Sequence, residues 1–122
     1  MQNLNELRDE IYDDAVAHRL WDEDYLLKTL VNSDVVRDSG ALQIYKIANA
    51  EQETRRVNAA LRVLLENQEL LESVLEEDHF REELAEVIIT ALSAAGYLGI
   101  DIEKAVRAKM EINRGREWRH GK

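Results

Sequence analysis

Residues 79–122 read HFREELAEVIITALSAAGYLGIDIEKAVRAKMEINRGREWRHGK, and this stretch decides the fold. Its first part, over about residues 79–97, is apolar at most helical positions and leaves one narrow polar strip, which consists of Glu82, Glu83, Glu86, Thr90 and Ser93. A helix that is apolar almost all round is expected to be buried between neighbours. After a glycine-containing turn, Asp101 is a capping residue for a second helix that runs to about residue 114. The stretch therefore predicts two consecutive helices, the first of them central to a helical domain.

The upstream sequence repeats the helical spacing of apolar residues. Residues 4–19 and 51–76 place apolar side chains three and four positions apart. Residues 23–49 show the same spacing, and the pair Ser39–Gly40 weakens and bends the helix that we expect there. The chain has no proline and only five glycines. We predict a single all-α domain over residues 1–122, folded as a four- to five-helix antiparallel bundle.

The composition is that of a soluble globular protein. Hydrophobic residues make up 45% and charged residues 34% of the chain, which suits one packed core and argues against wholesale disorder. No apolar run reaches the roughly 18 residues that a bilayer span needs, and no signal peptide is visible. The absence of cysteine excludes disulfides and thiolate sites, and the net charge of −9 opposes a general affinity for nucleic acid. We expect a cytoplasmic protein with no membrane and no nucleic-acid partner.

Charge is distributed unevenly along the chain. Residues 66–86 hold nine acidic residues and one arginine, whereas residues 104–122 hold seven Lys and Arg and two acids. Within the acidic segment, Glu83 and Glu86 are three residues apart and project from the same side of a helix. Two carboxylates in a partly buried groove repel each other and need a cation, a proton or a partner. The pair therefore suits Mg²⁺ or Mn²⁺, with a solvent-facing helix edge as the simpler alternative.

The basic end of the chain offers a second set of groups. Lys109, Asn113 and Arg116 are spaced four and three residues apart, so they share one face if the helix continues. Ammonium, amide and guanidinium groups on one face would hold phosphate oxygens. A basic helix end that complements the helix dipole is the alternative interpretation.

Acidic helix, turn and basic helix follow one another in an order that resembles a known family. The segment EELAEVIITALSAAGYLGIDIEKAVRAKMEINRGREWRHGK is similar to the C-terminal half of MazG-like all-α nucleoside triphosphate pyrophosphohydrolases, including phage-type members that end in R-P-Y-x-H-G-K. The family's E-x-x-D, G-I-D and K-x-x-x-N-x-x-R motifs correspond to Glu83 to Glu86, Gly99 to Asp101 and Lys109 to Arg116. This resemblance covers more than a third of the chain.

The resemblance implies a MazG-like bundle with a specific activity. A (d)NTP would be cleaved to the (d)NMP and pyrophosphate with Mg²⁺, or Mn²⁺, by a homo-oligomer that is a dimer or a tetramer. Glu83 and Glu86 would act in catalysis and, with acids of a preceding helix, hold the metal. The side chains of Lys109, Asn113 and Arg116 would bind the phosphates or the sugar.

The family's other acidic motif, E-E-x-x-E, has two candidate positions in this chain. In one register it falls on LLENQELL, where Glu66 and Glu69 are metal ligands and Leu65 occupies the first acidic position. In the other register, Asp34 and Asp38 of LVNSDVVRDS supply the ligands, and the apolar residues around them predict two buried acids that need a metal. The spacing to the downstream acids favours Glu66 and Glu69, with Asp34 and Asp38 as the alternative.

Departures from the family pattern leave a second function open. Leu65 is neutral where the family has an acid, and Glu86 replaces the usual aspartate. A catalytically degenerate MazG-like helical protein, acting as a nucleotide-binding or protein-interaction module, is therefore the alternative to the enzyme. Trp21, at a corner between helices, is interpreted as a core side chain, with a lid over the nucleobase as the other possibility.

Overall fold

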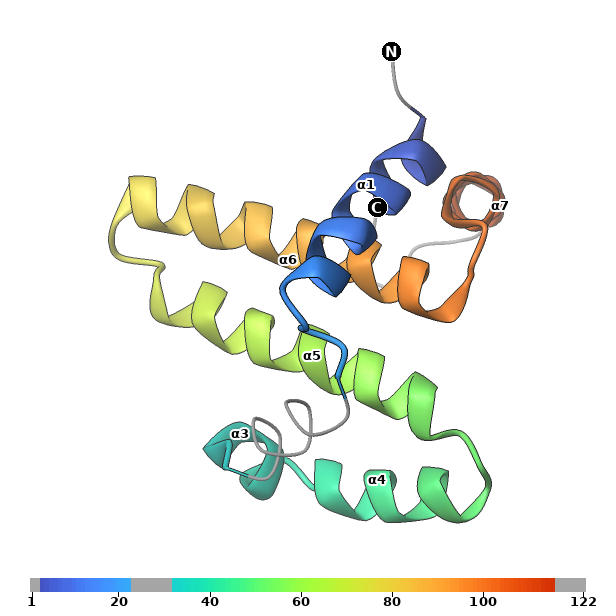
Figure 1. The fold of residues 1–122 in the computed structure, drawn as a ribbon. Helices are drawn as coiled ribbons and strands as arrows, with labels where there is room; N and C mark the ends of the chain where they lie inside the picture. Colours follow the sequence, from blue (N-terminus) through green and yellow to red (C-terminus); the bar gives the residue numbers. More distant parts are fainter. Residues whose placement is uncertain (1–2, 23–31, 116–122) are drawn as a thin grey trace.

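The computed structural model describes residues 3–22 and 32–115. Within these two ranges the chain forms helices and no strand, which confirms the predicted all-α fold class. The helices, shown in Figure 1, are α1 (Leu4–Ala17), α3 (Asp34–Asp38), α4 (Ala41–Ala50), α5 (Thr54–Glu72), α6 (Glu77–Leu98) and α7 (Ile102–Arg114). Four of these segments agree with the predicted helices to within a few residues at each end.

The antiparallel hairpin of α5 and α6 is the centre of the fold, and α1, α3 and α4 pack against it. These two helices make the most extensive contact between described helices, and α4 runs along the other side of α5 (Figure 1). In the turn between α5 and α6, the Ser73 hydroxyl donates a hydrogen bond to the carbonyl of Leu70 at 2.7 Å. The Glu76 carboxylate then caps α6 by accepting from the backbone N–H groups of Asp78 and His79, at 3.1 and 3.0 Å. The turn therefore fixes how far along α5 each residue of α6 lies.

The C-terminal half of α6 is the buried part of that helix. α1 crosses this half (Figure 1), and Gly96 allows the two helices to approach closely. A Cβ atom added at Gly96 would lie 2.5 Å from the Cβ of Tyr12, so only glycine allows this approach. The sequence predicts burial of the whole helix, but Leu84 in its first half and Ile88 near its middle are 43% and 55% exposed. The difference arises because α1 crosses α6 toward its C-terminal end (Figure 1).

The helix expected over residues 23–49 differs from the structure. Residues 23–31 lie outside the described part of the chain, and the remainder forms two helices, α3 and α4, rather than one bent helix. Gly40 separates them with φ of 79°, a left-handed conformation that interrupts helical hydrogen bonding. The apolar spacing of this segment therefore continues past Gly40, although the helix itself is interrupted there.

α7 is attached mainly through its first turn. The side-chain oxygen of Asn5 accepts from the backbone N–H groups of Ile102 and Glu103, at 2.9 and 3.2 Å. The predicted cap is present, because Asp101 accepts from the Lys104 N–H at 3.1 Å. Beyond this turn α7 has no buried residue. No single described helix is long and apolar enough to cross a membrane; α6 and α7 satisfy that criterion only jointly, and the chain bends by 115° between them.

The close contact at Gly96 predicts a stability effect. The substitution Gly96→Ala should lower the free energy of unfolding by about 1–3 kcal/mol, because the new methyl group forces α1 away from α6. Urea denaturation monitored by circular dichroism measures the change. Gly115→Ala is the control, since a Cβ there would meet its nearest atom at 3.8 Å. An increase in stability on Gly96→Ala, as helix propensity alone would give, would contradict the packing argument.

Candidate metal centre

Three carboxylates from α5 and α6 converge on one point of the hairpin. Glu66 and Glu69 are three residues apart on α5, and Glu83 lies opposite them on α6. Each of the three offers one oxygen, and these oxygens all lie within 4.8 Å of one another. Glu66 and Glu83 are half-buried and Glu69 is exposed. The antiparallel pairing of the helices thus brings together acids that are 14 residues or more apart in sequence.

The electrostatics of this cluster are unfavourable without a cation. Burial raises the pKa of Glu66 from 4.5 to about 7, and the neighbouring carboxylates of Glu69, Glu86 and Glu83 add to the rise. In addition, one oxygen of Glu66 and one of Glu83 are buried without a hydrogen-bond partner. Buried acceptors of this kind are costly unless they are paired or bound to a metal.

The donor set suits a hard divalent cation. Mg²⁺ and Mn²⁺ prefer carboxylate oxygens, and Mg²⁺ usually takes only a few protein ligands while keeping several waters. The three convergent glutamates, two of them with unpartnered buried oxygens, provide such a partial ligand set. His79 lies 3.4 Å from the Glu83 carboxylate through its Nε2 and is about half exposed, so it pairs with this acid only when protonated. The described residues therefore fit Mg²⁺ or Mn²⁺.

Glu86 lies beside this trio rather than within it. It is exposed, it is one helical turn from Glu83, and its charge contributes to the raised pKa of Glu66. Glu86 also lines a neighbouring pocket together with Glu66. Of the four acids predicted as metal ligands in the preferred register, three converge and the fourth borders the same pocket.

The alternative pair, Asp34 and Asp38, has different surroundings from those expected. Both residues are exposed, and Asp34 forms an ion pair with Arg37 on the surface of α3. The expectation that the two acids are buried is wrong, because the helix ends at Asp38 and does not continue the apolar face of α4. Among the described residues, neither belongs to a group of three or more potential metal ligands.

The pocket next to the acids has a volume of about 310 Å³ and lies between α1, α5 and α6. Its described lining consists of Ile11, Asp14, Ala15, Leu20, Trp21, Arg62, Glu66, Glu86, Ile89, Thr90 and Ser93. Trp21 is buried, its Nε1 donates to the Ser93 hydroxyl at 2.8 Å, and its ring stacks on Tyr97 with 4.2 Å between centroids. Trp21 is thus a fixed core side chain in the pocket wall. These contacts hold its ring in place, so it does not act as a movable lid over a nucleobase.

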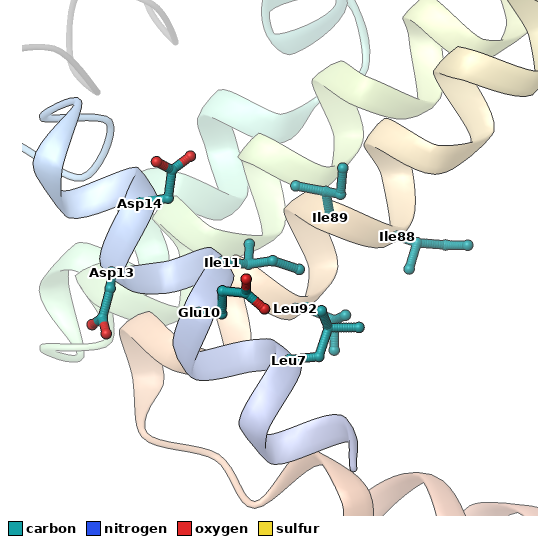
Figure 2. Close-up of a pocket in the computed structure, with 8 residues that line it drawn as sticks. All are labelled: Leu7, Glu10, Ile11, Asp13, Asp14, Ile88, Ile89 and Leu92. Carbon is teal, nitrogen blue, oxygen red and sulfur yellow. The ribbon is translucent and has the colours of Figure 1, made fainter. Parts of the chain in front are cut away.

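A second cavity adjoins this pocket along the α1–α6 interface. Figure 2 shows its lining, in which Leu7 of α1 and Leu92 of α6 point toward each other. The two cavities share Ile11, Asp14 and Ile89, so they are neighbours on one face of the molecule. This α1–α6 groove is mainly apolar, with Glu10, Asp13 and Asp14 as its acidic residues.

The two predicted substrate-binding residues that the structure describes, Lys109 and Asn113, do not line the pocket beside the acids. Lys109 is exposed on α7, Asn113 is half-buried with an unpartnered side-chain oxygen, and Arg116 lies outside the described residues. No described residue of α7 is part of that pocket lining. Their role in substrate binding stays a prediction. Arg62, which does line the pocket, was not singled out from the sequence; its position one turn before Glu66 is the signal that identifies it.

Comparison with known proteins gives one informative match. A stretch of 36 residues, 30% of this chain, is 53% identical to a dATP/dGTP diphosphohydrolase of Cyanophage S-2L. The aligned stretch covers 34% of that protein, so the chain matches about a third of the length of this curated relative. No protein-family model and no solved structure matches the chain. The match agrees with the resemblance to MazG-like proteins but is too short to establish membership of the family.

The raised pKa of Glu66 predicts a dependence of stability on pH. An acid with a higher pKa in the folded state binds its proton more strongly there, so its contribution is complete below about pH 4.5 and is lost as the pH rises through 7. Without divalent cations, the stability of Glu66→Gln relative to wild type should therefore increase from pH 5 to pH 8. Urea denaturation at a series of pH values in EDTA measures this difference. Glu72→Gln, at an exposed position on the same helix, is the control, and a difference for Glu66→Gln that does not vary with pH would contradict the expectation.

Proposed function

We propose that this protein is a metal-dependent nucleoside triphosphate pyrophosphohydrolase that cleaves a (d)NTP to the (d)NMP and pyrophosphate. The observation that carries the proposal is the convergence of Glu66, Glu69 and Glu83, with two buried carboxylate oxygens that have no partner. The short match to a phage dATP/dGTP diphosphohydrolase supports the same class of substrate. The adjoining pocket of about 310 Å³ is open to a nucleotide bound at the acids.

The residues of the site have separate roles in this reaction. Glu66, Glu69 and Glu83 would hold Mg²⁺ or Mn²⁺, which supplies charge neutralisation at the phosphates and a more acidic water. Glu86 is exposed beside this trio and would accept the proton of the attacking water. The water oxygen forms a bond to the α-phosphorus, and the bond from that phosphorus to the bridging oxygen breaks to release pyrophosphate. Part of the nucleotide would occupy the pocket that Glu66 and Trp21 line.

Leu65 favours the alternative of a degenerate protein. It is partly buried against the hydrophobic core, where the family motif has its first carboxylate. A side chain in this position provides no oxygen ligand, so the cluster has fewer acids than the family pattern. A protein that binds nucleotide with metal and does not turn it over would have this arrangement.

Substitution of Glu83 tests the enzymatic proposal. In the wild type, NTPs and dNTPs with Mg²⁺ or Mn²⁺ should release pyrophosphate. Glu83→Gln should reduce kcat at least about 100-fold, because a neutral amide replaces a negatively charged metal ligand. A coupled assay for pyrophosphate measures the rates. Glu82→Gln is the matched control, since this exposed neighbour on α6 is not part of the carboxylate trio and should retain activity.

Three other results discriminate between the alternatives, when the pyrophosphate assay is combined with measurement of the melting temperature. Absence of turnover together with a rise in melting temperature on adding metal and nucleotide would favour the degenerate binding module. Absence of both would refute the proposed function. Loss of activity in Asp34→Asn, with activity retained in Glu66→Gln, would show that Asp34 and Asp38 hold the metal in place of Glu66 and Glu69.

We also propose that the chain assembles as a homo-oligomer. Large apolar side chains remain exposed on several of the described helices, including Leu84 and Ile88 on α6 and Met110 and Ile112 on α7. Exposed apolar surface is a feature of protein interfaces. The apolar α1–α6 groove in Figure 2 lies next to Ile88 and extends this surface.

The oligomer has a direct test. Size-exclusion chromatography with light scattering should give the mass of a dimer or a tetramer, and Ile88→Glu should shift it toward that of the 14.1 kDa chain. The charge would be desolvated in the interface, which disfavours association. Glu82→Gln, on the same helix, should leave the mass unchanged. A monomeric wild type at micromolar concentration would contradict this proposal and leave the proposed reaction untouched.

A further inference from the structure

We propose that Arg62 is a substrate-binding residue that holds a phosphate group of the nucleotide at the mouth of the acidic cluster. This inference rests on the proposed function, and it assigns the positive charge of the site to a residue of α5. Arg62 is four residues, about one helical turn, before Glu66. Both side chains line the same pocket, together with Glu86 of α6.

The Arg62 side chain borders an aromatic pair in the pocket wall. Trp21 is fixed by its stack on Tyr97 and its hydrogen bond to Ser93. The Arg62 guanidinium lies 5.8 Å from the centre of the Trp21 ring, and that of Arg55 lies 4.1 Å from the centre of the Tyr97 ring. The two arginines thus flank one stacked pair, but only Arg62 belongs to the pocket lining. Contact with the ring restricts where the guanidinium points and lowers the entropy lost on binding an anion.

The chemistry of the pocket calls for a cation at this position. A nucleoside triphosphate carries several negative charges, and the described lining adds the carboxylates of Asp14, Glu66 and Glu86. Among the described residues that line the pocket, Arg62 is the only basic one. A guanidinium offers paired N–H donors that match two phosphate oxygens, which a single ammonium group does not. Arg62 therefore has the charge, the geometry and the location to bind phosphate.

A purely structural role for Arg62, as a cap on the Trp21 ring, makes a different prediction. Removal of the guanidinium would then lower stability without a specific effect on phosphate affinity. Arg55 provides the comparison within the same stack, because it contacts the Tyr97 ring and donates a hydrogen bond to the Tyr97 carbonyl. It contributes to the stack from outside the pocket, so its substitution reports the structural effect alone.

The test measures binding separately from turnover. Inorganic tripolyphosphate and a non-hydrolysable dNTP analogue, each with Mg²⁺, are titrated into the wild type, Arg62→Gln, Arg62→Lys and Arg55→Gln by calorimetry. The dissociation constant of both ligands should rise about 10- to 100-fold in Arg62→Gln and less in Arg62→Lys, as expected for loss of a charge-assisted pair. Arg55→Gln should lower the melting temperature while its dissociation constants remain within about twofold of wild type. Mn²⁺ alone should bind all four proteins equally.

The outcomes separate this inference from the proposed function. Equal tripolyphosphate affinity in wild type and Arg62→Gln would overturn the role of Arg62, whatever the turnover. Equal loss of affinity in Arg62→Gln and Arg55→Gln would also overturn it, in favour of the structural role. Weaker tripolyphosphate binding in Arg62→Gln alone, in a protein that releases no pyrophosphate, would support Arg62 and refute the hydrolase. A wild type that binds neither ligand would refute both.

Discussion

Repulsion between carboxylates that the α5–α6 hairpin holds together is the constraint on which the candidate site depends. Close packing where α1 crosses the second half of α6 supports this arrangement, with Leu92 and Ala95 buried there and Gly96 against Tyr12. Glu83 lies in the first half of α6, which is less covered. The free energy gained by apolar burial at one end of the hairpin thus offsets the repulsion at the other. The same division leaves the acids accessible to a cation and to a substrate.

Helical spacing alone could predict the hairpin but not which faces of α5 are covered. On α5, Glu66 and Glu69 lie opposite the apolar seam of Val57, Leu61 and Leu64, which in isolation indicates solvent exposure. In the structure α4 packs on the seam, while α6 covers the other side of α5 and brings Glu83 against these acids. A single sequence records the pattern of each helix. It does not record which neighbours each helix face will meet, and this is the reason that both registers stayed open at the sequence level.

Asp34 and Asp38 illustrate the opposite error, because the sequence pattern predicts that they are buried and the structure shows them exposed. Their apparent burial was inferred from apolar residues on both sides of the pair, and the downstream part of that face is reached only through Gly40, whose left-handed conformation ends the continuity. Periodicity assumes an unbroken backbone, so a single residue with positive φ rotates every later position relative to the earlier ones. Downstream, where Gly99 and Asp101 signalled the break explicitly, the predicted boundaries of α6 and α7 agree with the structure. The predicted helix boundaries were therefore accurate at Gly99 and Asp101, which were interpreted as a helix end and a cap. They were wrong at Gly40, which was interpreted as a bend and not as a helix end.

The balance of charge bears on Leu65, the neutral residue in the acidic motif of the MazG-like pattern that this sequence resembles. Glu66, Glu69, Glu83 and Glu86 together carry more negative charge than one divalent cation neutralises, and a triphosphate would add to the excess. Leucine at position 65 removes one carboxylate from this group, which lowers the repulsion but also the number of possible ligands. A metal bound by fewer carboxylates neutralises phosphate charge more effectively, because less of its own charge is already compensated. A cationic side chain in the wall of the same pocket acts in the same direction, and Arg62 has that position. The neutral residue in the acidic motif is thus compatible with phosphate chemistry, provided that the convergent trio of Glu66, Glu69 and Glu83 suffices to retain the ion.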